Sequence, residues 1–450
     1  MRQSRFVDGL VTILAGLLCT LPWVWLGEAW GLEAEDWRLD NGLRVILVHE
    51  AKAPVVVTEV WYRVGGIDER AGKTGLSHML EHMMFRGTQE VPAGEYSRII
   101  ARHGGEDNAS TSWDYTSYWS KLSSDHLDLA LRLEADRMHN LIIDPGKFHS
   151  ENLVVREERR TRYDSNPQGR FFEKFKTFFF QDHPYGRPVI GWMSDILGYT
   201  VKDLETWYRT WYTPDNAILV VVGDVDFNQA KKMIQTYFAP ITSGTRKVAA
   251  RLPEMQQVTG GRRLLEQDKG AMGPVLHLAW PAPSLTFGHP EDVYSMNVLT
   301  TILGGSGSSR LYRRVVMEQQ LAVSVEAQFG GGYSLGLDTL EISSEPRDGI
   351  ALAKLEMALL NDVDSLGNTL VADEELQRAK NGLLAEWIYS KDSVDHLAAL
   401  IGHLSVNGLD WRQFVEHYPT RIQDVTATQI RDIARRYLAK DKAVIGILTP

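Results

Sequence analysis

Two histidines and a glutamate with helical spacing are the residues of this chain best suited to metal chemistry. His78 and His82 are four residues apart, so on a helix their imidazoles lie on one face, about one turn from each other. Two imidazoles so placed can bind one Zn²⁺ ion. Glu81 lies on nearly the same face, where it can reach a metal-activated water without being a ligand. The order His-x-x-Glu-His is the reverse of the better-known His-Glu-x-x-His arrangement.

Such a site needs a third protein ligand, because two histidines alone leave a zinc ion incompletely held. A second helix is predicted to begin at Asp144-Pro145, an N-cap residue followed by proline at the first helical position. This helix carries Glu151, Glu157 and Glu158. Glu151 and Glu158 are seven residues apart and share a face, whereas Glu157 is rotated by about 100°. Spacing alone leaves the third ligand open.

The elements that must position these residues alternate unevenly between strands and helices, which predicts an α+β layer architecture. Thr74 is expected to cap the helix that carries both histidines, and Gly87 to stop it. Strands are expected at 43–48, 54–64, 217–222 and 274–280, and helices at 76–85, 95–103, 126–141, 145–163 and 201–211. The aromatic segment 171–185 carries no assignment.

Four segments together resemble the pitrilysin and mitochondrial processing peptidase superfamily of zinc metallopeptidases. They are the motif from His78 to His82, the run Val154-Val155-Arg156-Glu157-Glu158, the stretch Gly104-Gly105…Asn108-Ala109, and His183-Pro184-Tyr185-Gly186. The resemblance covers the chain beyond its N-terminal segment. It implies an α+β fold of two similar lobes, each a mainly antiparallel sheet covered by helices.

The resemblance also implies how the metal is held. In that family the third ligand is a glutamate about 76 residues beyond the second histidine, which is Glu158 here. A supporting carboxylate seven residues earlier corresponds to Glu151. One Zn²⁺ per chain is then expected on His78, His82 and Glu158. Glu81 would accept a proton from the activated water and pass it to the leaving amine, so that a peptide bond is hydrolysed without a covalent intermediate.

Substrate binding is expected at the stretch 108–118, which begins with Asn108 and Ala109. In the family, the peptide or protein substrate lies there as an added strand on a sheet edge, and its backbone groups are satisfied by the neighbouring strand. Serine, threonine and tyrosine give this stretch strand propensity. An ordinary edge strand without substrate contacts is the alternative interpretation.

One departure from the family pattern concerns a substrate-binding pair in the second half. Relatives that act as single chains or homodimers have an arginine and, seven residues on, a tyrosine that hold the substrate carbonyl. The corresponding residues here are Val316 and Val323, whose side chains cannot donate a hydrogen bond to an oxyanion. The resemblance therefore implies a metal-free partner subunit that carries the pair. A self-sufficient homodimer, with Arg310, Arg313 or Arg314 as substitute, and a non-catalytic scaffold subunit are the alternatives.

Length and composition describe an ordinary globular protein of two or more domains. The chain has 450 residues, of which 44% are apolar and 24% charged. Its formal net charge is −10, and basic residues are scattered among acidic ones. Nucleic acid is therefore excluded as a partner, because phosphate neutralisation needs a clustered basic face.

Residues 1–34 have the pattern of a secretory signal. Arg2 and Arg5 precede an apolar run from Leu10 to Leu26, and small residues follow it. A periplasmic or secreted protein is expected; an uncleaved membrane anchor or a buried helix are the alternatives. The one cysteine, Cys19, lies inside this segment, so removal of the segment excludes disulfides and thiolate ligands.

The remainder divides into two halves that resemble each other. The segments Thr200–Gly223 and Thr426–Thr449 match at a constant offset of 226, each with a helical pattern, a polar turn and a buried strand. Residues 242–262 are rich in glycine, serine and proline and are expected to form a linker. The predicted organisation is an N-terminal zinc-binding lobe at 35–241 and a homologous C-terminal lobe without a metal site at 263–450.

Overall fold

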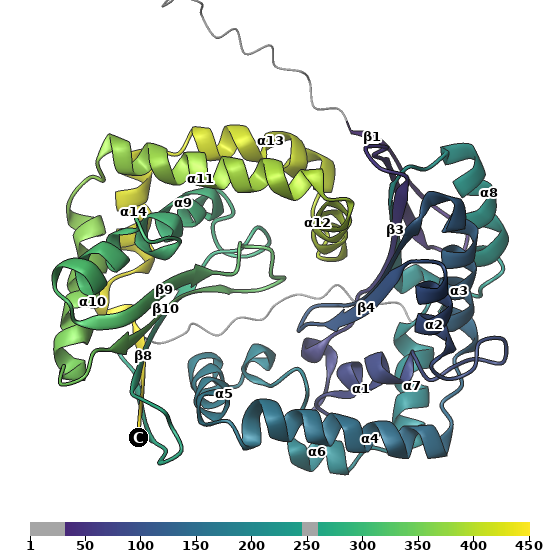
Figure 1. Ribbon diagram of the computed structural model, residues 1–450, viewed down its shortest axis with the longest axis horizontal. Coiled ribbons are helices and arrows are strands. Elements are labelled where there is room, and N and C mark those ends of the chain that lie inside the picture. Colours follow the sequence, from purple (N-terminus) through teal and green to yellow (C-terminus); the bar gives the residue numbers. More distant parts are fainter. Residues whose placement is uncertain (1–31, 245–259) are drawn as a thin grey trace, which may run out of the picture. The chain divides into compact units, whose positions relative to one another are not determined.

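The computed structural model describes residues 32–244 and 260–450 (Figure 1). Residues 1–31 of the predicted signal segment and 245–259 of the predicted linker lie outside the described residues. Within the described ranges, no helix combines the length and the hydropathy that a bilayer span requires. Two sheets, each covered by helices, make up the described chain and confirm the predicted α+β class.

The first sheet has six strands in the order β1-β2-β6-β3-β5-β4. Only β2 and β6 pair in parallel; the other neighbours are antiparallel. The central strand β6 is buried along its whole length, as expected for its uninterrupted apolar run. The strands are β1 (Glu33–Arg38), β2 (Arg44–His49), β3 (Val55–Tyr62), β4 (Glu106–Thr111), β5 (Thr116–Ser123) and β6 (Ala217–Gly223).

Most helices of the first half pack their apolar faces on this sheet and on one another. One continuous core joins side chains of β2, β3 and β6 to α1, α3, α7 and α8. The helices are α1 (Leu76–Met83), α2 (Glu95–Arg102), α3 (Leu127–Asn140), α4 (Pro145–Arg159), α5 (Pro167–Phe180), α6 (Met193–Leu197), α7 (Val201–Trp211) and α8 (Phe227–Phe238). The helix predicted to end at Tyr163 instead changes to a π-helical turn at Arg160–Asp164.

The second sheet has five strands in the order β7-β11-β8-β10-β9, again with a single parallel pair, β7 with β11. Its strands are β7 (Arg263–Gln267), β8 (Val275–Ala282), β9 (Ala322–Phe329), β10 (Asp338–Pro346) and β11 (Val444–Thr449). The helices of this half are α9 (Asp292–Gly304), α10 (Leu352–Asn368), α11 (Asp373–Asp392), α12 (Val394–Val406), α13 (Trp411–Gln423) and α14 (Ala427–Tyr437), with a π-helical segment at Tyr312–Glu318.

The internal repeat in the sequence corresponds to one structural unit used twice. Helices α7 and α14 each begin with a capping box, closed by Thr200 and Asp203 in one half and by Thr426 and Gln429 in the other. Each helix leads through a short 3₁₀ turn into a strand, β6 or β11, of its own sheet. The two N-cap residues, Thr200 and Thr426, are 226 residues apart, the offset found in the sequence. The same helix–turn–strand unit therefore occurs in both halves.

Each half also covers the sheet of the other half with one helix. Helix α12 of the second half lies against β3 and β6, and α5 of the first half lies against β7 and β11. Glycine allows the close approach at both contacts. A Cβ atom on Gly402 would stand 1.9 Å from Nε1 of Trp61, and one on Gly446 would stand 2.5 Å from the Phe175 ring. This exchange explains why the aromatic segment around α5 is so apolar.

We expect Gly402→Ala to destabilise the protein, because the added methyl group would overlap the Trp61 indole on β3. Overpacking of a close contact typically costs about 1–3 kcal/mol. The matched control is Gly382→Ala in α11, where an added Cβ meets no atom within 4 Å. That control should gain up to about 1 kcal/mol from helix propensity. Urea unfolding of both variants measures the difference, and equal midpoints would contradict the α12 contact.

Candidate metal centre

Helix α1 is held at its start by a carboxylate from outside the helix. Its N-cap is Gly75, with φ 88°, and not Thr74 as the sequence suggested. The buried Glu69 side chain accepts the backbone N–H groups of Gly75 (2.6 Å) and Ser77 (2.8 Å), and so satisfies donors at the positive end of the helix. Thr74 bonds instead to Asp195 through its backbone N–H (3.0 Å) and its hydroxyl (2.6 Å).

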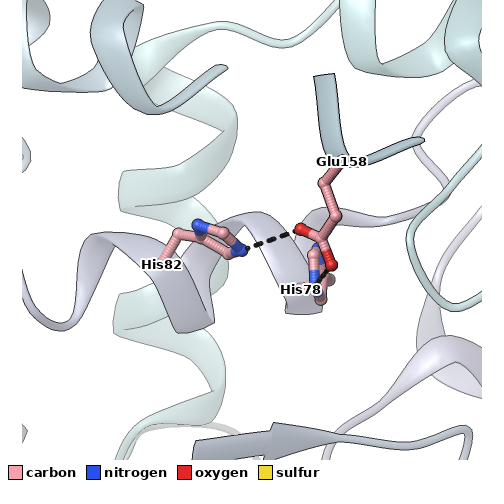
Figure 2. A group of neighbouring side chains, drawn as sticks. All are labelled: His78, His82 and Glu158. Carbon is pink, nitrogen blue, oxygen red and sulfur yellow. Dashed lines mark ion pairs between the residues drawn. The ribbon is translucent and has the colours of Figure 1, made fainter. Parts of the chain in front are cut away.

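The two histidines of α1 face the end of α4 (Figure 2). The His78 and His82 ring centroids are 4.8 Å apart, on one face of the helix as predicted. Glu158 of α4 lies 3.3 Å from Nε2 of His82 and 3.7 Å from Nε2 of His78. One nitrogen from each histidine and one Glu158 oxygen all lie within 4.8 Å of one another. Among residues 32–244 and 260–450, this is the one such group of three.

Glu151 contacts His82 on the ring nitrogen that Glu158 does not contact. Its carboxylate is 3.3 Å from Nδ1 of His82, the nitrogen that points away from Glu158, and 2.6 Å from the Arg86 guanidinium. A carboxylate on the second nitrogen of a metal-binding histidine typically fixes its ring orientation and tautomer. Glu157, by contrast, has a 68% exposed side chain and pairs with Arg160. The structure therefore brings Glu151 and Glu158 to the histidines and leaves Glu157 outside.

Burial and ion pairing shift the pKa values of the three potential ligands in different directions. Burial, with His82 nearby, lowers the pKa of His78 to about 4. Burial would also lower the pKa of His82, but its hydrogen bonds with Glu151 and Glu158 outweigh this and raise it to about 9. Burial raises the pKa of Glu158, but His82 and neighbouring cations more than offset this and lower it. At pH 7 a metal ion would therefore displace a proton from His82.

Glu81 projects from the same helix and is tied to the neighbouring strand. It accepts a short hydrogen bond from the hydroxyl of Thr111 at the end of β4. Burial raises the pKa of Glu81, although the Thr111 hydrogen bond opposes the shift. A raised pKa lies closer to pH 7, which suits a carboxyl group that must both accept and donate a proton.

The donor set fits a zinc ion. Two imidazole nitrogens and one carboxylate oxygen are the three-ligand set of many catalytic zinc sites, which leave the fourth position to water. The residues that the structure describes include no cysteine, so the donors available among them are nitrogen and oxygen atoms. Oxygen and nitrogen donors at close range favour a borderline ion such as Zn²⁺.

The stretch predicted as one edge strand, 108–118, is two strands joined by a turn. Strand β4 ends at Thr111, the turn spans 112–115, and β5 begins at Thr116. Only β4, which carries Asn108 and Ala109, lies at the sheet edge, while β5 pairs on both sides. Strand β4 also contacts α1. An edge with one open side therefore lies beside the helix that carries the histidines.

The positions of the absent arginine and tyrosine differ in exposure. Val316 is 5% exposed in the π-helical segment, and Val323 is 59% exposed on the edge strand β9. Of the arginines that might substitute, Arg310 pairs with Glu375 and Arg314 with Asp362. Arg313 forms no ion pair with any residue in the described ranges.

Sequence reasoning missed two residues of this centre, Glu69 and Thr111. Glu69 lies six residues before Gly75, outside the local window in which a cap is sought. Thr111 follows Asn108-Ala109-Ser110 at the end of a strand, and strand alternation places its side chain on the face opposite Ser110. The alternation of side chains along the strand could have indicated Thr111. The strand was predicted to continue to 118, so Thr111 was not recognised as its last residue.

Comparisons with known proteins agree on one family. Residues 44–192 match the family model described as "Insulinase (Peptidase family M16)", and residues 198–383 match "Peptidase M16 inactive domain". All three potential ligands lie in the first region. The chain is 30% identical to the zinc protease PqqE of Helicobacter pylori, with 99% of each chain covered. It is 28% identical to an uncharacterized zinc protease of Mycobacterium leprae, over 91% of this chain and 90% of that protein.

Among solved structures, a crystal structure of a protease from Helicobacter pylori superposes with a TM-score of 0.87 at 28% identity. The superposition covers 93% of this chain and 100% of that chain, so both halves and their helices are shared. With its two lobes and its full-length relatives named zinc proteases, this chain belongs to the M16 family of peptidases, within the pitrilysin superfamily.

Proposed function

We propose that this chain is a zinc-dependent endopeptidase subunit that binds one Zn²⁺ through His78, His82 and Glu158. The observation that carries the proposal is the meeting of these three donors within 4.8 Å, with Glu81 on the same helix. The full-length relatives named zinc proteases support it. When bound, the ion lowers the pKa of a water molecule and polarises the scissile carbonyl.

The remaining work of hydrolysis falls to the protein's own side chains. Glu81 accepts the proton of the attacking water on a carboxylate oxygen and then donates it to the leaving amine nitrogen. Glu151 holds the ring of His82 through Nδ1. The peptide substrate adds as a strand to the open edge of β4 at Asn108 and Ala109, where backbone hydrogen bonds align its scissile bond.

Two further features belong to the same proposal. A homologous metal-free subunit supplies the arginine and tyrosine that Val316 and Val323 replace. Residues 1–34 direct the chain to the periplasm or the cell exterior, where the lobes at 35–241 and 263–450 act together across the linker 242–262. No nucleic acid takes part, and a membrane does so only where the N-terminal segment is kept as an anchor.

The metal assignment is tested by comparing two adjacent glutamates. Glu158→Gln should lower the zinc content well below one per chain, because it removes the ligand charge and one coordination bond. Glu157→Gln is the matched control, since that side chain is 68% exposed and pairs with Arg160. Both variants are purified in full length, dialysed against limiting zinc and analysed by mass spectrometry of the metal.

The same samples test the peptidase assignment. In whichever state of assembly the wild type is active, chelation should abolish cleavage of a fluorogenic peptide mixture, and added Zn²⁺ should restore it. A Glu158→Gln variant that retains one zinc per chain, with Glu157→Gln losing its metal, would place the ligand one residue earlier on α4.

A further inference from the structure

The base candidate Glu81 has a single side-chain hydrogen bond to the residues that the structure describes. Its Oε2 accepts the Thr111 hydroxyl, while Oε1 makes none. A carboxylate on a helix can rotate about three side-chain bonds, and one charge-assisted hydrogen bond is enough to select one orientation. The bond therefore fixes one carboxylate oxygen, Oε2, and leaves the other, Oε1, without a side-chain hydrogen bond among the described residues.

Thr111 is itself held by an anchored turn. It pairs with Thr116 across β4 and β5, and the residues between them are bonded to other parts of the fold. The carbonyl groups of Ser112 and Trp113 accept the backbone N–H groups of Gly66 (3.1 Å) and Ile67 (3.0 Å). The hydroxyl that meets Glu81 thus stands on a strand end with little freedom to move.

The second half of the chain also contacts this turn. The Asp114 carboxylate accepts the Tyr185 hydroxyl (2.8 Å) and the backbone N–H of Leu335 (3.0 Å). The Tyr185 hydroxyl in turn accepts the N–H of Gly336 (2.9 Å). A loop between β9 and β10 is therefore part of the frame that fixes the position of Thr111.

We propose that Thr111 is a positioning residue for the peptidase reaction, one that holds the Glu81 carboxylate so that its free oxygen faces the attacking water. The inference rests on the proposed peptidase function. Because Thr111 ends the strand to which the peptide adds, one strand aligns both the substrate and the base. Preorganisation of this kind raises turnover without changing substrate affinity.

The test uses the isosteric change Thr111→Val, which keeps the branched side chain and removes only the donor. Kinetics are measured on the zinc-loaded full chain, in whichever state of assembly the wild type is active, with one fluorogenic peptide. A charge-assisted hydrogen bond contributes about 1.5–3 kcal/mol, so kcat should fall about 10- to 100-fold with KM within twofold. Thr111→Ser, which restores the hydroxyl, should recover most of kcat.

A matched control separates positioning from general loss of packing. Thr58→Val removes another strand hydroxyl, which is buried and bonded to Ser120 (2.9 Å) and not to Glu81. That variant should leave kcat near wild type. Thr111→Ser as slow as Thr111→Val, or a change in KM alone, would overturn the proposal.

A crystal structure of zinc-loaded Thr111→Val gives a readout that does not depend on activity. Glu81 should occupy more than one orientation in the variant and one in the wild type. An unmoved Glu81 would overturn the positioning role. A wild type that binds zinc and cleaves no peptide in any assembly would instead refute the proposed function, while the crystal structures would still decide the role of Thr111.

Discussion

Glu81→Gln should bind zinc like the wild type and lose about 10²- to 10⁴-fold in kcat, the usual contribution of a general acid–base. The substitution leaves His78, His82 and Glu158 in place, so the metal-binding donors are unchanged. The glutamine carbonyl can still accept the Thr111 hydroxyl, and the side chain keeps its place on α1. What it cannot do is take a proton from water at neutral pH.

The measurement combines metal analysis with single-turnover cleavage of a fluorogenic peptide by equal amounts of loaded protein, in whichever state of assembly the wild type is active. Glu157→Gln serves as the control, because it makes the same chemical change on a side chain that is exposed and paired with Arg160. Turnover by Glu81→Gln within a few-fold of wild type would assign the proton transfer to another group. Loss of zinc from Glu81→Gln would show that this glutamate supports the ligands.

The best predicted elements are those whose signals are local. Helix α7 was expected at 201–211 and lies there, because Thr200 and Asp203 form a reciprocal cap within four residues. The start of α4 was equally clear, since Asp144 accepts the N–H of Lys147 and Pro145 follows it. The spacing between the histidines, and between Glu151 and Glu158, predicted which side chains share a helix face for the same reason: helical periodicity is a short-range property.

The errors arise where distant residues decide the local structure. Thr74 looked like a cap for α1, but Asp195, far along the chain, binds it, and Glu69 satisfies the helix instead. The turn at 112–115 contains no glycine or proline, the residues that most often indicate a turn in a sequence. It is held by contacts with Tyr185 and Leu335 that no local pattern reveals. Helix α5 was missed because it is buried against the sheet of the other half.

In the described part of the second half, valines stand at the two positions that correspond to the substrate-binding arginine and tyrosine of relatives. Neither Val316 nor Val323 offers a donor, and Arg310 and Arg314 are occupied by Glu375 and Asp362. If Arg310 or Arg314 were to bind the substrate instead, it would have to break its buried or half-buried ion pair. Arg313 is the one arginine of the three without such a pair in the described ranges, so the homodimer alternative depends on it.

We therefore expect the zinc-loaded chain to cleave peptides poorly by itself and to gain at least about 10²- to 10³-fold when a metal-free relative is added. That relative is one that lacks the His-x-x-Glu-His motif and has an arginine and a tyrosine seven residues apart. Each donor to a developing oxyanion typically contributes about 10²- to 10³-fold, so two donors give a large effect. Size-exclusion chromatography of the mixture should show a heterodimer, and its activity should track the heterodimer fraction.

Arg313→Gln distinguishes the alternatives within the same experiment. In a heterodimer whose partner supplies the donors, Arg313→Gln should leave the activity of the mixture near that of wild type. In a self-sufficient homodimer, the wild-type chain would be fully active without a partner, and Arg313→Gln would lose about 10²-fold or more. Full activity of the isolated chain would thus reject the metal-free partner, and the response of Arg313→Gln would then show whether this arginine replaces the missing pair.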